Sequence, residues 1–161
     1  MAVTRDIAAT YRGPGRVMRR LLEMGSREDR ALALLMSGCA VVFVAQWPRL
    51  AREAHLTDQA LNALMAGTLM AVMLILPLLL YALAFVSLGV LRALGRPVTG
   101  HATRLALFWA FLAASPLTLL HGLTAGFIGP GPALDLVGLA WCGVFLWFWV
   151  SNLREAAWGN H

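Results

Sequence analysis

Few side chains of this sequence could do chemistry, because most of them sit in long apolar segments. The best candidates are His121, which follows Thr118 by three residues, and Asp135, with Gln46 as a third polar residue. Ionisable groups are costly in lipid and are therefore functional suspects in apolar segments. Each also has a simpler explanation, since a helix N-terminus favours Asp135 and local hydrogen bonding satisfies His121. We expect Gln46, His121 and Asp135 to form a polar cluster, and a water-filled cavity there would favour transport.

No pattern of catalytic or ligand-binding residues accompanies this cluster. The sequence has no HExxH, no GxS with a partner histidine and no CxxC. His101 and His121 fall on one expected helix, about 30 Å apart at ~1.5 Å per residue, which argues against a haem held by two histidines. Cys39 and Cys142 lie mid-way along apolar segments, where thiols behave as small hydrophobes. We therefore predict a protein that is not an enzyme, with no catalytic residue, no cofactor and no metal ion.

The segment around which the rest of the chain is organised is long and uncharged, and it runs from Gln59 to Leu91. It contains no Asp, Glu, Lys, Arg or His. As a helix it would be about 50 Å long, against a hydrocarbon core of about 30 Å. Pro77 is expected to bend this helix without dividing it, because two separate halves would each be too short to span. Of all residues, 60% are hydrophobic and 13% charged, against roughly 25% charged in soluble domains, which predicts an integral membrane protein.

Four apolar segments indicate an all-α membrane protein. We expect a four-helix transmembrane bundle in 27–153, a cytoplasmic amphipathic segment in 1–26 and a short cytoplasmic tail in 154–161. Trp47 and Pro48 predict the end of the first helix, and Ser115 with Pro116 predicts a kink in the third, where the serine hydroxyl would satisfy a freed carbonyl. The expected spans cover approximately 28–47, 60–92, 102–127 and 133–152.

The distribution of arginine predicts how the bundle is oriented. The net charge is +5, and all basic residues other than histidine are arginines. Eleven arginines fall in the N-terminal segment, the second loop and the tail, whereas two fall in the first loop and none in the third. Positive charge collects on the cytoplasmic side of membrane proteins, so we expect both termini in the cytoplasm of a bacterium, with the chain in its inner membrane. The same distribution argues against a nucleic-acid partner.

The N-terminal segment is predicted to contain a short amphipathic helix. After a break at Pro14 and Gly15, the sequence RVMRRLLEM places an apolar stripe on one face and arginines around the other. This pattern is typical of a helix at the membrane surface with its stripe facing lipid; the alternative is a solvated helix that caps the bundle. The arginines expected to bind anionic lipid headgroups or a partner are Arg12, Arg16, Arg19, Arg20, Arg92 and Arg96.

Small residues recur at every fourth position in two of the expected helices. This spacing allows helices to approach closely in a membrane. The third span carries the longer series and is expected to be central, with two or three neighbouring helices. The residues expected to pack at such contacts are Ala63, Gly67 and Ala71 in the second span and Ala106, Ala110, Ala114, Gly122 and Gly126 in the third.

Several segments together carry a family resemblance. They read, in order, RVMRRLLEMGSREDRALALLM, VFVAQWPRLAREAHL, ALFWAFLAASPLTLLHGLTAGFIGPGPA and GVFLWFWVSNLREA. This order resembles bacterial members of the Yip-one domain family, the Ypt-interacting membrane proteins. The resemblance implies a small multi-pass helical protein with a cytosolic N-terminus, and eukaryotic members are associated with Rab-type GTPases. The eukaryotic Asp-Leu-Tyr-Gly-Pro motif is absent here, so the resemblance transfers no functional residue.

The sequence therefore favours a function in binding. We expect a non-enzymatic scaffold or membrane-organising protein whose partners are anionic lipids and other membrane proteins or a second copy of the chain. The first alternative is an accessory subunit of a larger respiratory or photosynthetic complex, and the second is a small transporter or channel.

Overall fold

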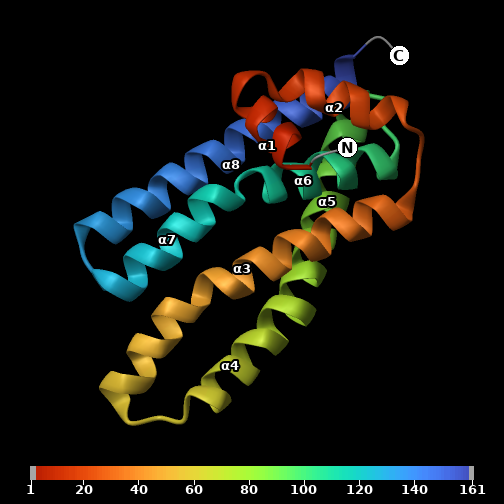
Figure 1. Ribbon diagram of the computed structural model, residues 1–161. Coiled ribbons are helices and arrows are strands. Elements are labelled where there is room, and N and C mark those ends of the chain that lie inside the picture. Colours follow the sequence, from red (N-terminus) through yellow and green to blue (C-terminus); the bar gives the residue numbers. More distant parts are fainter. Residues whose placement is uncertain (1–2, 160–161) are drawn as a thin grey trace.

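The computed structural model describes residues 3–159, and every regular element in that range is a helix (Figure 1). The prediction of an all-helical chain is therefore confirmed for this range. The elements are α1 (Val3–Arg12), α2 (Pro14–Glu23), α3 (Glu28–Thr57), α4 (Leu61–Met70), the π-helical turn η1 (Ala71–Ile75), α5 (Leu76–Ala93), α6 (Gly100–Ala113), α7 (Ser115–Phe127) and α8 (Pro132–Trp158). Figure 1 shows α1, α2, the start of α6 and the end of α8 at one end of the molecule, with the α3–α4 connection at the opposite end.

Three helical segments are long and apolar enough to cross a membrane: α3, the continuous run Leu61–Ala93, and α8. The helices α6 and α7 meet this criterion only together, with a bend of 44° between them, which makes four segments if the bent pair is counted as one. Large apolar side chains cover the outside of these helices; Leu78 and Leu139 are each 70% exposed and Phe85 is 76% exposed. Apolar surface of this extent is typical of a protein whose solvent is lipid.

The predicted long helix around Pro77 forms one run, with a π turn immediately before the proline. The Leu76 N–H donates to the Ala71 carbonyl, five residues back. Proline lacks an N–H, and its ring collides with the carbonyl four residues earlier, here that of Met73. The wider π turn accommodates this mismatch, so the helical course is not interrupted at the proline.

The expected end of the first helix at Pro48 is wrong, because α3 continues to Thr57. Tertiary contacts hold the additional turns in place: Leu50 is 2% exposed, and the Arg52 guanidinium donates to the carbonyls of Gly126 (3.3 Å) and Phe127 (3.5 Å) at the end of α7. Residues 49–57 are therefore helix and not the polar loop that their composition suggests.

Helix α6 is the centre of the core. All its residues from Leu105 to Ala113 are buried, and α3, α5 and α8 pack around it. A helix that is apolar on every side is stable only when it is enclosed in this way. The third span was expected to be central. Its first half, α6, has that position, whereas its second half, α7, packs mainly along α3.

The kink expected at Ser115 and Pro116 is present as the 44° bend between α6 and α7. Pro116 has no N–H for the carbonyl of Leu112, and the last regular bond of α6 runs from the Ala114 N–H to the Ala110 carbonyl at 3.0 Å. The side-chain bond near the bend comes from Thr118, whose Oγ1 donates to the Ala114 carbonyl (3.4 Å), and not from Ser115 as expected.

The two series of small residues differ in what surrounds them. Ala106, Ala110 and Ala114 are completely buried. A Cβ added at Gly122 would lie 1.8 Å from the Ala45 carbonyl oxygen, and one added at Gly126 would lie 2.3 Å from Pro48 Cβ, so α7 and α3 touch through their backbones.

The expected contact on the second span is wrong within the described chain. Ala63, Gly67 and Ala71 are exposed, and no atom lies within 4 Å of a Cβ built at Gly67. The reason is that this span reaches the core through α5, on which Leu80 and Ala84 are buried, whereas no residue of α4 is buried.

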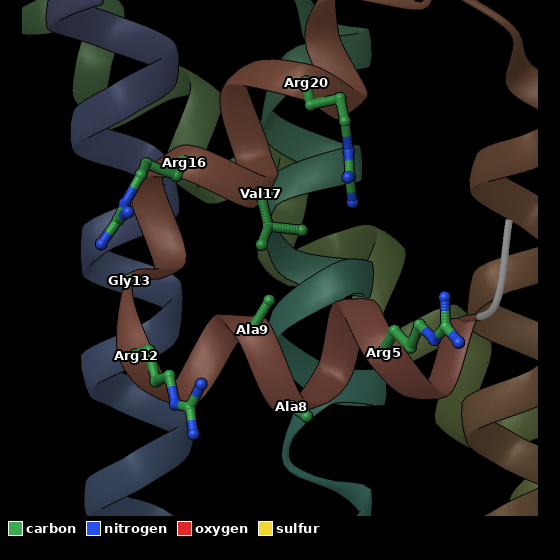
Figure 2. A pocket seen from close by; sticks show the side chains of 8 residues that line it. All are labelled: Arg5, Ala8, Ala9, Arg12, Gly13, Arg16, Val17 and Arg20. Carbon is green, nitrogen blue, oxygen red and sulfur yellow. The ribbon is translucent and has the colours of Figure 1, made fainter.

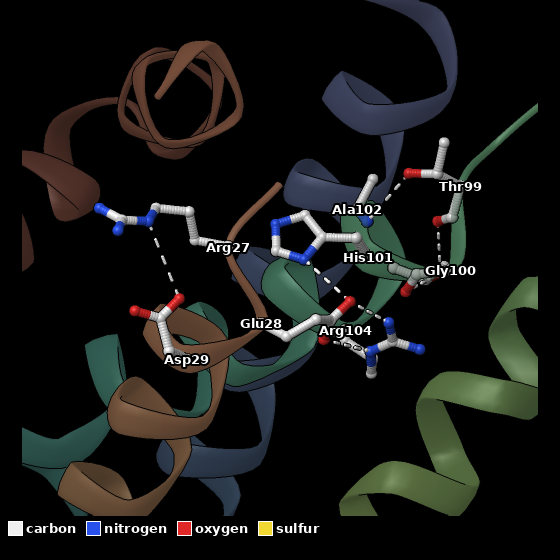
Figure 3. Close-up of polar contacts among 9 residues, drawn as sticks. Arg27, Glu28, Asp29, Thr99, Gly100, His101, Ala102 and Arg104 are labelled. Carbon is white, nitrogen blue, oxygen red and sulfur yellow. Dashed lines mark hydrogen bonds and ion pairs between the residues drawn. The ribbon is translucent and has the colours of Figure 1, made fainter. Parts of the chain in front are cut away.

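A group of ion pairs and hydrogen bonds connects the start of α3 to the start of α6 (Figure 3). The Glu28 carboxylate accepts from Arg104 Nε at 3.2 Å and lies 3.2 Å from His101 Nδ1. Thr99 caps α6, because its Oγ1 accepts from the Ala102 N–H at 3.2 Å. These contacts fix the end of the molecule on which α1 and α2 rest.

Candidate functional site

Four arginines from α1 and α2 surround a pocket of about 540 Å³, which we call the arginine pocket (Figure 2). Figure 2 shows that the two helices meet at Gly13 and contribute two arginines each. The remaining lining is small or aliphatic, so the charged groups stand around an apolar floor. The lining residues are Arg5, Ala8, Ala9, Arg12, Gly13, Arg16, Val17 and Arg20.

Helix α1 is held in place by a buried hydrogen bond to the core. Trp109 Nε1 donates to Thr10 Oγ1 at 3.1 Å, and the same hydroxyl donates to the Asp6 carbonyl at 2.7 Å. The Tyr11 ring packs edge-on against Phe148, with 4.9 Å between ring centroids. Burial raises the pKa of the Tyr11 phenol, so this group stays neutral at physiological pH and adds no negative charge beside the arginines.

Helix α2 packs its apolar stripe on the protein. Val17, Met18 and Leu21 are buried in the cluster that contains Trp109 and Phe148. The expectation that this stripe faces lipid is therefore wrong, and α2 has the position of the alternative, a helix that caps the end of the molecule. The physical reason is that the large rings of α6 and α8 offer the stripe an apolar surface within the chain itself.

Two arginines of α2 are engaged in ion pairs. Arg19 Nε donates to Glu155 Oε1 at 2.7 Å, which joins α2 to α8, and Arg20 pairs with Asp6, which joins α2 to α1. The hydrogen bond to Glu155 raises the pKa of the Arg19 guanidinium, which is charged at every physiological pH. Arg19 and Arg20 therefore have a structural role in addition to their charge.

Arg12 and Arg16 differ from these two, because neither forms an ion pair within residues 3–159. Both are exposed, and they come from opposite sides of the turn at Gly13. The pocket therefore carries four guanidinium groups and one neutralising carboxylate, that of Asp6. A concave surface of this charge is suited to an anion with several oxygens, such as a phosphate.

The six arginines predicted to form one basic surface do not all meet. Arg12, Arg16 and Arg20 line the pocket, whereas Arg19 pairs with Glu155 beside it. Arg96 lies over the Trp158 ring, 4.4 Å from its centroid, and Arg92 is exposed at the end of α5. The expected set also lacks Arg5, which the spacing could have revealed, because Arg5 and Arg12 are seven residues apart and share a helix face.

The predicted polar cluster is present in part. Gln46 and His121 line one cavity of about 380 Å³ between α3, α5, α6, α7 and α8, which we call the Gln46–His121 cavity. Asp135 does not line it and is exposed in the first turn of α8, so its inclusion is wrong. The other lining residues are mostly apolar: Val42, Leu76, Phe111, Thr118, Gly138, Trp141 and Cys142. The walls therefore favour an apolar occupant over a column of water.

Comparison with known proteins found no match, so the function is inferred from this geometry. No protein-family model, no curated protein and no solved structure matches the chain. The resemblance to the Yip-one domain family accordingly stays a prediction. In the part of the chain that the structure describes, no three His, Cys, Asp or Glu side chains come together as a metal site.

Proposed function

We propose that this chain is a multi-pass membrane scaffold that works by binding, and that its arginine pocket takes the phosphate groups of anionic lipid headgroups. The observation that carries the proposal is the pair Arg12 and Arg16, which line the pocket without a carboxylate partner among the described residues. Basic groups near an anionic bilayer each contribute about 1 kcal/mol of attraction.

The position of the pocket supports this proposal. It lies on α1 and α2, at the end of the molecule where the long apolar helices α5 and α8 finish (Figure 1). If these helices cross a bilayer, the pocket is placed near the headgroup layer. The apolar floor of Ala8, Ala9 and Val17 would meet the upper part of the acyl chains, while the guanidinium groups meet the phosphates.

A bundle of four spans in a bacterial inner membrane completes the proposal, with the bent pair α6–α7 as the third span. In this arrangement the eleven arginines of the N-terminal segment, of the region from the end of α5 to the start of α6, and of the end of α8 share the cytoplasmic side, and Arg49 and Arg52 lie on the other side. Both termini are then cytoplasmic.

Reporter fusions test this topology. A reporter inserted in the α3–α4 connection at Gln59, or after Gly131, should be active on the periplasmic side, and one after Gly95 on the cytoplasmic side. Gln59 is a better insertion site than Glu53, because Glu53 lies inside α3, which continues to Thr57. A cytoplasmic signal at Gly131 would show that the pair α6–α7 turns back within the membrane and would contradict four spans.

Headgroup binding is tested by removing Arg12 and Arg16 together, as Arg12→Gln/Arg16→Gln. At about 1 kcal/mol for each arginine, the variant should bind phosphatidylglycerol roughly thirtyfold more weakly. Native mass spectrometry of the protein in neutral detergent, titrated with phosphatidylglycerol or phosphatidylcholine, measures this difference. Arg19 and Arg20 are left intact because their ion pairs hold α2 on α8 and α1.

The matched control is Arg27→Gln/Arg49→Gln, which removes the same charge outside the pocket. It should bind phosphatidylglycerol like the parent protein. Equal weakening in the two double variants would mean that net charge alone attracts the lipid. Unchanged binding by Arg12→Gln/Arg16→Gln would mean that the pocket is not the site.

A further inference from the structure

We propose that the arginine pocket prefers a lipid with two phosphates, diphosphatidylglycerol, and binds one phosphate at each of its two ends. This inference rests on the proposed function, because it concerns the same pocket, and it adds which anionic lipid the pocket selects. The evidence is that the four arginines are divided into two separate pairs. Basic pockets at the cytoplasmic end of membrane helices are known to suit headgroups of this class.

One pair of arginines lies at the turn between α1 and α2, which we call the turn end of the pocket. Arg12 directly precedes Gly13, and the Arg16 guanidinium folds back towards the same glycine. A Cβ built at Gly13 would lie 3.1 Å from Arg16 Nε and 3.2 Å from its Nη2. Figure 2 shows the two side chains on either side of Gly13. Because neither has an ion pair within residues 3–159, the turn end carries two uncompensated positive charges.

The other pair lies away from the turn, at what we call the open end of the pocket. Arg20 forms its ion pair with Asp6, whose side chain is only 14% exposed, and Arg5 is the neighbour of Asp6 in α1. Figure 2 shows Arg5 and Arg20 on the side of the pocket away from Gly13. Arg5 has no ion pair in the described part of the chain, so the open end carries one net positive charge.

The two ends are held apart, with a neutral floor between them. Arg5 and Arg12 are seven residues apart in α1, which at ~1.5 Å per residue separates them by about 10 Å along the helix. Ala8 and Ala9 lie between them on the same helix face and line the pocket. The ion pair with Asp6 keeps Arg20 from joining the turn end. A single phosphate therefore meets one pair of arginines and leaves the other free.

This arrangement matches the headgroup of diphosphatidylglycerol. Its two phosphodiesters each carry a single negative charge, and an uncharged glycerol joins them. The small side chains of the floor leave space for that glycerol between the two ends. Phosphatidylglycerol has one phosphodiester and can occupy only one end, for which the turn end has the larger net charge. The phosphate monoester of phosphatidic acid carries nearly two charges, but at one place, so it also leaves the open end empty.

The test removes charge from the open end alone, as Arg5→Gln. Arg5 is exposed, and Arg20 is left intact because its ion pair joins α2 to α1. The full-length protein in neutral detergent is titrated with diphosphatidylglycerol, phosphatidylglycerol or phosphatidic acid and followed by native mass spectrometry, at about pH 8 so that the monoester is dianionic. The parent should bind diphosphatidylglycerol at least about fivefold more tightly than either other lipid. Arg5→Gln should weaken diphosphatidylglycerol binding about fivefold and leave the other two affinities unchanged.

The matched control is Arg27→Gln, which removes one charge from an arginine that is 65% exposed and lies outside the pocket. It should bind all three lipids like the parent. Equal affinity of the parent for diphosphatidylglycerol and phosphatidic acid would overturn the inference, because the pocket would then respond to charge and not to two separated phosphates. Unchanged diphosphatidylglycerol binding by Arg5→Gln would also overturn it, and so would equal weakening of diphosphatidylglycerol and phosphatidylglycerol binding.

Failure of this inference can be told apart from failure of the proposed function. Unchanged phosphatidylglycerol binding by Arg12→Gln/Arg16→Gln contradicts the proposed function, and the preference for two phosphates fails with it. If that double variant loses phosphatidylglycerol while Arg5→Gln affects both lipids alike, the pocket binds headgroups but does not distinguish one phosphate from two.

Discussion

Replacing Gly122 with alanine should destabilise the protein by about 3 kcal/mol or more, at the upper end of the range for overpacking. The added Cβ would lie 1.8 Å from the Ala45 carbonyl oxygen and 2.7 Å from its carbon. Both are backbone atoms, which cannot rotate away as a side chain can. Relief therefore requires α3 and α7 to separate along their length. The midpoint of thermal unfolding in detergent, followed by circular dichroism, measures the effect.

Gly89→Ala is the control for this substitution. No atom lies within 4 Å of a Cβ built at Gly89, which is exposed on α5. Alanine is a better helix former than glycine by about 1 kcal/mol, so the midpoint should stay the same or rise. Equal midpoints for Gly122→Ala and Gly89→Ala would contradict the close contact between α3 and α7.

Replacing Trp109 with alanine should cost about 3 to 5 kcal/mol, as is usual for a fully buried aromatic residue. Trp109 is 1% exposed and belongs to the cluster that joins α2, α6 and α8. The substitution also removes the N–H that bonds Thr10, so α1 should be released. Two measurements follow this change: the unfolding midpoint should fall, and trypsin should cleave faster after Arg5 and Arg12.

Two other substitutions separate packing from hydrogen bonding at this position. Trp109→Phe keeps a large ring and loses the bond to Thr10, so it should cost about 1 kcal/mol from that bond, plus a smaller packing loss. Trp147→Ala removes an indole that is 50% exposed and should leave α1 as protected as in the parent. If trypsin cleaves Trp109→Ala no faster than the parent, α1 does not depend on this contact.

The course of the long helices could be predicted from the sequence because lipid imposes a simple rule. Uninterrupted apolar runs in lipid must form helices, and the π turn before Pro77 and the bend at Pro116 have causes that act within one helical turn. Pro48 has the same chemistry but a different outcome, since α3 continues through it. The deciding contacts come from residues distant in sequence, Gly126 and Phe127, whose carbonyls accept from Arg52. Such contacts leave no local signal.

The candidate sites were less predictable, because they depend on which helix faces meet. The apolar stripe of α2 has the same pattern whether it covers lipid or protein, and only the position of Trp109 and Phe148 decides between them. Arg19 and Arg20 likewise look equivalent to Arg16 until Glu155 and Asp6 are placed beside them. The meeting of Gln46 with His121 was expected from their place along the helices.

The π turn at Ala71–Ile75 alters the rotational phase of the helix that contains it. One residue more than an α-helical turn requires is accommodated there, and each residue of an α-helix corresponds to about 100° of rotation. The spacing alone places the face of α4 with Ala63 and Gly67 on a different side from the face of α5 that buries Leu80 and Ala84, and the π turn rotates the two faces further relative to each other. A hydrophobic periodicity calculated over the whole run Leu61–Ala93 therefore averages the directions of two different helix faces. Deleting one residue from this turn would rotate α4 against α5 and redirect its small-residue face without changing a single side chain on it.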